Sequence, residues 1–218
     1  MTQKIPIFKQ WIKIVVGLII FALGVHLTIF ANIGLAPWDV LGMGISMHTP
    51  LSYGLSMTCI AVTVLVIDIL LRERIGYGTI IDALLTGNAT ELFNRINPFP
   101  KCENVWLGIV IMILGLAVMA VGQLIYMKGA QCCGPRDSLL VALGKRLKSV
   151  PIGVVEILIW AAVLLAGWML GGPVGIGTLI STFGAGAVMQ VIYSAVHFEP
   201  RSIRHRDVTE VTREFFGK

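Results

Sequence analysis

Apolar residues occur in long runs along this chain, and short polar stretches separate one run from the next. Five runs are well defined, each about 20 residues long or slightly longer: residues 11–35, 52–71, 105–127, 152–170 and 175–197. An α-helix rises about 1.5 Å per residue, so a run of this length matches a hydrocarbon core about 30 Å thick. The pattern therefore predicts an integral membrane protein with several membrane-spanning helices.

A sixth apolar run, residues 78–96, is weaker because polar side chains interrupt it: Asp82, Asn88, Glu91, Asn94 and Arg95. A charge in the middle of a membrane costs roughly 2.5–3.5 kcal/mol on translocon scales, and such residues usually face the interior of a helix bundle. We therefore expect residues 78–96 to form a sixth span that turns its polar side toward the other helices.

Two shorter segments, residues 37–48 and 135–148, lie between the long runs and begin with the same P-x-D pattern. As helices they would be roughly 18–21 Å long, which is too short to cross the membrane. Proline suits the first turn of a helix because its missing N–H has no partner there, and an acid complements the positive helix end. Each segment is therefore predicted to be a short re-entrant or interfacial helix, with Ala36 or Gly134 as its N-cap.

The P-x-D pattern belongs to an internal repeat. At an offset of 98 residues, Pro37 aligns with Pro135 and Asp39 with Asp137. At an offset of 99, the GYGT stretch at 76–79 aligns with the GIGT stretch at 175–178. The second offset also aligns Gly54 with Gly153, Gly87 with Gly186, and Glu91 with Gln190. Three spans in each copy would bring the second copy into the membrane from the opposite side to the first.

The predicted fold is therefore an all-α integral membrane protein with six transmembrane helices, arranged as two inverted three-span repeats. Each repeat has one short helix after P-x-D, and the repeats cover about residues 11–97 and 104–197 of a single membrane domain at 11–198. Residues 1–10 and 199–218 are expected to be a cytoplasmic N-terminus and a cytoplasmic tail. Inverted repeats with short, interrupted helices are a recurring architecture of transporters.

Charge changes this picture by giving an orientation. The chain is 56% hydrophobic and 13% charged, with a net charge of +5. If six spans follow a cytoplasmic N-terminus, all of the 17 lysines and arginines except Arg95 and Lys101 lie on the cytoplasmic side. This is the positive-inside pattern of a multi-pass membrane protein with a cytoplasmic N-terminus. The basic charge therefore indicates topology and does not point to nucleic acid.

The sequence contains none of the common enzyme or metal-site motifs. Its four cysteines form no C-x-x-C pattern, and no GxSxG or HExxH stretch occurs. The GxGT stretches lack the GK[ST] ending of a phosphate loop. We expect no enzymatic activity, no cofactor and no metal. The GxGT stretches are better explained as the starts of helices that pack closely on their neighbours. Together with the two P-x-D prolines, the residues predicted to serve helix starts and packing are Pro37, Gly76, Gly78, Thr79, Pro135, Gly175, Gly177 and Thr178.

Six polar residues are candidates for a substrate or ion pathway: Asp39, Asp82, Glu91, Arg136, Asp137 and Gln190. Asp82 is the strongest of these, because no basic residue lies at helical spacing from it. Asp39 and Asp137 have a simpler explanation as acids that complement the starts of their helices. By contrast, Asp68 has Arg72 four residues later and is predicted to form an ion pair with it.

Arg136 and Trp38 occupy matched positions of the two repeats. Membrane topology alone explains both, since tryptophan favours the membrane interface and arginine the cytoplasmic side. Alternatively, Arg136 pairs with an acid of the bundle or with a carboxylate or phosphate of a substrate. The sequence leaves these alternatives open, and with them the sign of the substrate's charge.

Several motifs together resemble the YczE/YitT-like family of bacterial multi-pass membrane proteins. They are APWDVL at 36–41, RIGYGT at 74–79, GPRDSLL at 134–140, Glu156, LGG at 170–172 and GIGT at 175–178. The likeness covers about residues 10–195 and favours the YczE branch, because the tail is too short for the extra soluble domain of YitT-type members. The resemblance implies the six-span fold and assigns no substrate.

Two hypotheses about function follow. The first is a small secondary transporter or exporter of an unidentified small solute or ion, with its site between the repeats. The second is a non-transporting scaffold in the lipid bilayer that organises a cytoplasmic partner through its basic face, which includes Lys145, Arg146, Lys148 and the tail. A polar cavity between the repeats would favour the first, and a closed apolar interface the second. Whether the chain forms a homodimer stays open.

Overall fold

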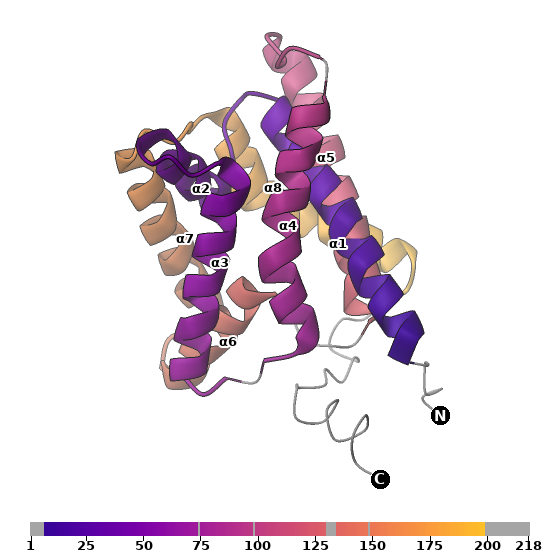
Figure 1. Ribbon diagram of the computed structural model, residues 1–218, viewed down its shortest axis with the longest axis vertical. Coiled ribbons are helices and arrows are strands. Elements are labelled where there is room, and N and C mark those ends of the chain that lie inside the picture. The colour runs from indigo at the N-terminus through magenta and orange to yellow at the C-terminus, as the bar shows by residue number, and fades with distance from the viewer. Residues whose placement is uncertain (1–6, 74, 98, 130–133, 148, 199–218) are drawn as a thin grey trace.

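The computed structural model describes residues 7–73, 75–97, 99–129, 134–147 and 149–198 (Figure 1). Within these ranges the chain is helical and has no strand. Its helices are α1 (Ile7–Phe30), α2 (Pro37–His48), α3 (Tyr53–Leu70), α4 (Tyr77–Ile96), α5 (Val105–Met127), α6 (Pro135–Arg146), α7 (Ile152–Met169) and α8 (Ile176–Ala195). The predicted tail 199–218, residues 1–6 of the predicted N-terminal segment, Arg74 and Lys148 lie outside the described residues.

Five helices are long and apolar enough to cross a membrane: α1, α3, α5, α7 and α8. Helix α4 has the same length as α8, 20 residues, but does not belong to this group because its polar side chains lower its hydropathy. Helices α2 and α6 have 12 residues each and are too short to cross. The chain is thus an all-α, multi-pass membrane protein, and a sixth span through α4 stays a prediction.

The short helices and the helices after GxGT begin at the motifs identified in the sequence. Pro37 and Pro135 are the first residues of α2 and α6, after Ala36 and Gly134 as N-caps. Helices α4 and α8 begin directly after Gly76 and Gly175. At these two starts, the hydroxyls of Thr79 and Thr178 accept hydrogen bonds from the backbone N–H of Gly76 and Gly175, at 3.4 and 3.2 Å. These are local capping interactions.

The order and packing of the first four helices recur in the last four. Each helix from α5 to α8 begins 98 or 99 residues after its counterpart from α1 to α4. Helix α1 packs along α5, α4 packs on α1 as α8 does on α5, and α2 packs on α7 as α6 does on α3. The most extensive contact that is not repeated is that of α3 along α4, because α7 and α8 do not pack along each other within the described residues. A smaller contact of α4 with α6 likewise has no comparable counterpart between α8 and α2 there.

Glycines allow the central pair, α1 and α5, to approach closely. A Cβ atom added to Gly17 would lie 2.8 Å from the carbonyl oxygen of Gly122, and one added to Gly115 would lie 3.0 Å from that of Gly24. Small residues at such contacts are typical of packed membrane helices. Because α1 and α5 are counterparts, this seam forms the centre about which the other helices are arranged.

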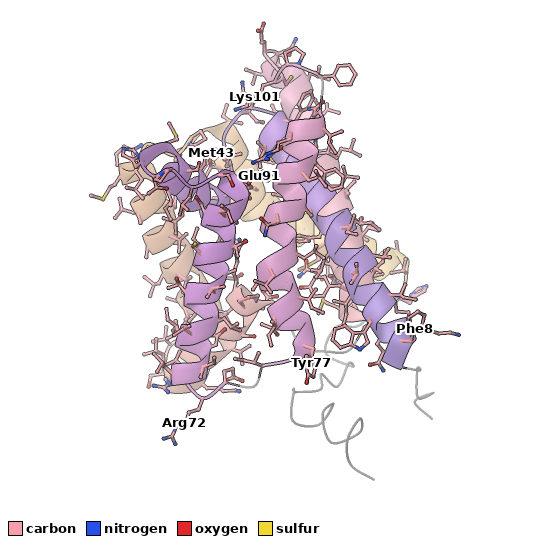
Figure 2. All side chains as sticks on the ribbon, viewed as in Figure 1. Phe8, Met43, Arg72, Tyr77, Glu91 and Lys101 are labelled. Atoms are coloured by element: carbon pink, nitrogen blue, oxygen red, sulfur yellow. The ribbon has the colours of Figure 1, made fainter. Side chains whose placement is uncertain are left out.

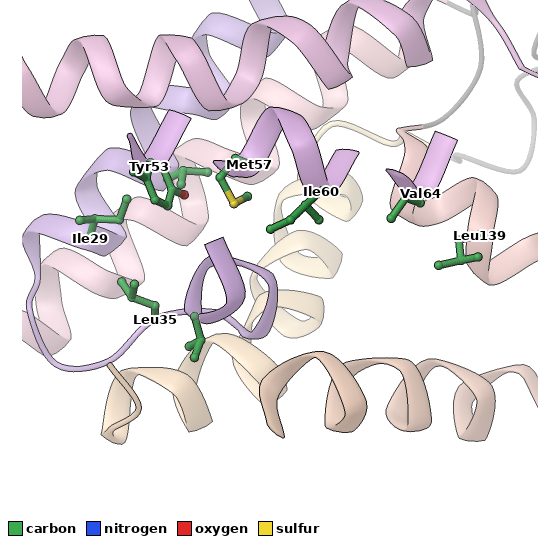
Figure 3. Packing of buried hydrophobic residues seen from close by; sticks show 9 residues of the cluster. Ile29, Leu35, Tyr53, Met57, Ile60, Val64 and Leu139 are labelled. Carbon is green, nitrogen blue, oxygen red and sulfur yellow. The ribbon is translucent and has the colours of Figure 1, made fainter. Parts of the chain in front are cut away.

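A second group of contacts holds α2 and α3 against the bundle. Its buried apolar residues come from α1, α2, α3, α6 and the loop before α2 (Figure 3): Val25, Ile29, Leu35, Val40, Tyr53, Met57, Ile60, Val64 and Leu139. At the far end of α3, Lys145 forms an ion pair with Glu73 at 2.6 Å, which ties the end of α6 to the loop after α3. Together these contacts fix both short helices against α3.

Candidate functional site

A cavity of about 240 Å³ lies where the two short helices begin, and all eight helices contribute to its lining. Its polar and aromatic lining includes Trp38, Asp39, Asp82, Thr86, Gln123, Tyr126, Arg136, Asp137, Glu156, Trp160 and Ser181. Ligand pockets commonly have volumes of roughly 300–1,000 Å³, so this cavity suits a small solute.

Many lining residues occupy matched positions of the recurring helices. Besides the stretches 36–39 and 134–137, the matched pairs in the lining are Phe21 and Met119, Val25 and Gln123, Met57 and Glu156, Ala61 and Trp160, Asp82 and Ser181, and Thr86 and Ala185. The cavity therefore lies between the two sets of helices, and each set contributes different chemistry at equivalent places.

The first turns of α2 and α6 meet across the cavity through Trp38 and Arg136. The guanidinium carbon of Arg136 lies 5.1 Å from the centre of the Trp38 ring, which is a cation–π contact. Arg136 forms no ion pair with any acid in the described ranges. Of the interpretations offered above, the direct pairing of Arg136 with an acid of the bundle is therefore not the arrangement found.

Asp39 is held in place by a neighbour. Its side chain is buried, and its Oδ1 accepts a hydrogen bond from the Tyr53 hydroxyl at 3.0 Å. Because Asp39 lies in the first turn of α2 and Tyr53 begins α3, this bond joins the starts of the two helices. Asp39 therefore has a structural partner, although it also lines the cavity.

Asp82 projects from α4 toward the start of α6. Its Oδ1 accepts a hydrogen bond from the Thr86 hydroxyl at 2.5 Å, one helical turn along. Its Oδ2 would lie 2.6 Å from a Cβ atom added to Gly134, the N-cap of α6, and the Oδ2 of Asp137 would lie 4.0 Å from the same position. Two carboxylates are thus gathered at the positive end of one short helix.

Asp137 and Glu156 face the cavity without a partner. Asp137 is exposed and Glu156 half-buried, and neither forms a hydrogen bond or an ion pair with the residues that the structure describes. With Asp39 and Asp82, they place four carboxyl groups around a single guanidinium group. Acidic groups therefore outnumber basic ones in this cavity, and two of the acids are free to bind something else.

Glu91 and Gln190, which the sequence placed on the same pathway, lie outside the cavity. Glu91 accepts hydrogen bonds from the Ser52 hydroxyl and from the Gly54 backbone N–H, the latter at 2.7 Å, and it pairs with Arg95. Through its bonds to Ser52 and Gly54, Glu91 caps the start of α3 and joins it to α4. Gln190 is exposed and donates to the Ser194 hydroxyl at 3.4 Å. The positions of these two side chains do not support their predicted part in the pathway.

The residues of the GxGT stretches serve helix packing in the described part of the chain, and none of them lines the cavity. A Cβ atom added to Gly175 would lie 2.5 Å from the carbonyl oxygen of Ile33. The backbone N–H of Gly177 donates to that same oxygen at 2.7 Å. At the other stretch, Gly76 and Gly78 are buried. These contacts pin the start of α8 to the loop that precedes α2.

Asp68 does not form the ion pair predicted with Arg72. Both carboxylate oxygens of Asp68 are buried and have no hydrogen-bond partner among the residues that the structure describes. Helix α3 ends at Leu70, and Arg72 adopts a positive φ of 55° and is exposed. The prediction was wrong because the spacing of four residues brings side chains together only where the helix continues.

Several lining residues were missed as site residues in the sequence, among them Thr86, Gln123, Glu156, Trp160 and Ser181. The internal repeat could have identified some of them, since Ser181 is the counterpart of Asp82. Thr86 follows Asp82 at helical spacing, as Trp160 follows Glu156. No group of three or more histidine, cysteine or acidic residues within the described ranges is arranged to hold a metal ion.

Comparisons with known proteins agree with the membrane fold. A family model described as a "Family of unknown function (DUF6198)" matches residues 8–194. An uncharacterized protein of Haemophilus influenzae is 27% identical over 83% of this chain and 81% of its own length. The uncharacterized membrane protein YczE of Bacillus subtilis is 28% identical over 86% of this chain and 87% of its own. These matches confirm the resemblance to YczE drawn from the motifs.

A third relative is the uncharacterized protein YyaS of Bacillus subtilis, which is 28% identical over 87% of this chain and 96% of its own length. No solved structure matches the chain. All three relatives are matched in sequence over more than four fifths of both chains, so the similarity covers most of each relative's length.

Proposed function

The chain belongs to the DUF6198 family, a family of unknown function, and we propose that it is a small secondary transporter or exporter that moves a small, positively charged solute through the cavity between its two sets of helices. The observation that carries this proposal is the cavity itself, with two acids that form no hydrogen bond or ion pair with any described residue. Charged groups within a membrane are costly and usually mark a pathway.

The proposal includes the six-span fold. If α4 crosses with the five apolar helices, each set of four helices crosses three times, and the second set is inverted relative to the first. The recurring packing partners support this arrangement. Arg72 and Lys101 lie at opposite ends of the bundle (Figure 2), which agrees with the orientation expected from charge. Both chain ends would then be cytoplasmic, in the bacterial inner membrane.

The lining supports transport over a scaffold. A scaffold would be served best by a closed, apolar contact between the two sets of helices, because unpaired polar groups there would destabilise it. Instead, acids, an arginine and a glutamine lie among mostly apolar residues around an open volume. A transport site needs such groups, since they replace the water that a solute loses when it enters the membrane.

The charge balance supports a cationic solute. Four carboxyl groups face one guanidinium group, and the excess of negative charge attracts cations into the cavity. Trp38 and Trp160 add aromatic rings, whose faces also attract cations. Asp137 and Glu156 have no competing partner, so they are the groups that we expect to bind the solute or to exchange it for protons.

A flux screen in proteoliposomes tests this proposal. The full chain would be reconstituted, and uptake of alkali cations, small amines and small carboxylates measured with and without a pH gradient. We expect uptake of a cation that falls to the level of empty vesicles in Asp82→Asn, while Glu103→Gln, an exposed acid outside the cavity, keeps the wild-type rate. Uptake of carboxylates alone, or equal cation uptake in Asp82→Asn and wild type, would contradict the proposal.

A further inference from the structure

The contact between α3 and α4 is made by two glycines. A Cβ atom added to Gly87 would lie 2.8 Å from the carbonyl oxygen of Gly54, and one added to Gly54 would lie 2.9 Å from that of Gly87. The two backbones therefore touch, and no side chain fits between them. This contact closes the first set of helices on one side of the cavity.

Polar bonds reinforce the same contact. Glu91 of α4 accepts from the backbone N–H of Gly54 at 2.7 Å, and Asn88 of α4 donates to the Thr58 hydroxyl of α3 at 3.1 Å. Each of these residues, like each of the two glycines, has a counterpart 99 residues later. The counterpart of Gly54 is Gly153, that of Gly87 is Gly186 and that of Glu91 is Gln190.

In the second set of helices, the counterparts stand apart. A Cβ atom added to Gly153 or to Gly186 would meet no atom within 4 Å. Helix α7 lies at the left edge of the bundle in Figure 1, and α8 runs behind α4. Gln190 bonds to Ser194 on its own helix, as Glu91 does to Arg95 in the first set. The two glycines and an acceptor at the position of Glu91 are thus present in α7 and α8 but are not joined, whereas Thr58 and Asn88 correspond to Ile157 and Ala187, which cannot form the same bond.

The second set has what it needs to make the contact. Gly153 is the second residue of α7, so its N–H lacks a partner within the helix. The side-chain carbonyl of Gln190 can accept that N–H, as the carboxylate of Glu91 accepts the N–H of Gly54. Glycine destabilises a helix relative to alanine, so a glycine in a helix is expected to allow a close contact. Gly153 and Gly186 make no such contact here, which points to a state in which they do.

We propose that α7 and α8 close on each other through Gly153 and Gly186 in a second state of this molecule, while α3 and α4 separate at Gly54 and Gly87. One glycine contact replaces another, while the bond between Asn88 and Thr58 has no replacement, because their counterparts are Ala187 and Ile157. The inference deepens the proposed function: exchange between the states would open the cavity first to one membrane face and then to the other. The closure itself needs no solute.

Cysteine pairs at matched positions test the closure. In a chain whose four cysteines are replaced by serine, one pair is Thr58→Cys with Asn88→Cys, which are in contact here. The matched pair is Ile157→Cys with Ala187→Cys, both on exposed positions of α7 and α8. We expect a short bifunctional thiol reagent to cross-link both pairs within one chain. If the second pair fails to cross-link, or does so only between two copies, the closure is wrong.

Bulky substitutions of the matched glycines give an independent measurement. Gly186→Leu has room in the present structure, so it should fold normally and abolish the cross-link between residues 157 and 187. Gly87→Leu collides with the backbone of α3, so it should weaken the 58–88 cross-link and strengthen the 157–187 cross-link. An unchanged 157–187 cross-link in Gly186→Leu would overturn the closure, even if Gly87→Leu does not fold.

The same variants separate this inference from the proposed function. Cross-linking is measured without any solute, so a 157–187 cross-link that Gly186→Leu abolishes supports the closure even where no cation flux is found, and the missing flux counts against transport alone. Cation flux that persists in Gly186→Leu, with no 157–187 cross-link in its parent, overturns the closure and leaves transport in place.

Discussion

The first turns of α2 and α6 share a proline and an aspartate at matched positions, yet the two carboxylates have different surroundings. Asp39 is buried and bonded to Tyr53, whereas Asp137 is exposed and has no hydrogen bond or ion pair with the described part of the chain. Trp38 next to the one acid stacks on Arg136 next to the other. A duplicated helix start can therefore keep its structural use in one copy and leave its acid free for binding in the other.

The largest expected difference in stability is between truncation of Asp39 and truncation of Asp137. Asp39→Ala leaves the buried Tyr53 hydroxyl without its acceptor, and we expect the free energy of unfolding to fall by about 1–3 kcal/mol. Asp137→Ala removes no hydrogen bond from the described structure and should change the same quantity by less than about 0.5 kcal/mol. Thermal unfolding in detergent compares the two, and equal losses would remove the distinction drawn here.

The contact between Trp38 and Arg136 should be measurable as a coupling. A double-mutant cycle with Trp38→Leu and Arg136→Gln should give an interaction free energy of about 0.5–2 kcal/mol, as expected for a cation–π pair away from bulk water. Trp160→Leu, a second tryptophan of the cavity, serves as the control partner and should show little coupling to Arg136→Gln. Additive effects of Trp38→Leu and Arg136→Gln would show that the stacking contributes nothing.

Of the buried acids, Asp68 is the one whose substitution should change the free energy of unfolding least. Unlike Asp39, it has no partner to lose, so Asp68→Asn should leave the free energy of unfolding within about 1 kcal/mol of wild type or raise it. Tm in detergent measures this, with Asp39→Ala in the same series. A loss for Asp68→Asn as large as that for Asp39→Ala would reveal a partner that the described residues do not include.

Features that depend on local chemistry could be predicted from the sequence. Helices α2 and α6 begin at Pro37 and Pro135 because proline is favoured in the first turn of a helix. Helices α4 and α8 begin after Gly76 and Gly175, whose N-cap positions also depend only on the residues next to them. The long apolar runs likewise indicate helices of the right length without any knowledge of their packing.

Features that depend on how the two sets of helices meet could not be predicted. Glu156 has Met57 as its counterpart, so the repeat does not mark it as a lining residue, and only the family resemblance drew attention to it. Gln190 matches Glu91 in sequence, but α7 and α8 stand apart where α3 and α4 touch. Both sets contain the glycines for this contact, so the sequence alone does not say which pair is closed.

Cation uptake by proteoliposomes that contain Asp137→Asn or Asp39→Asn tests the central claim most directly. Both changes remove one negative charge at matched positions, and an asparagine at position 39 can still accept the bond from Tyr53. The account predicts that Asp137→Asn lowers uptake to the level of empty vesicles and that Asp39→Asn keeps most of it. Full uptake in Asp137→Asn, or the same loss in both variants, would contradict it.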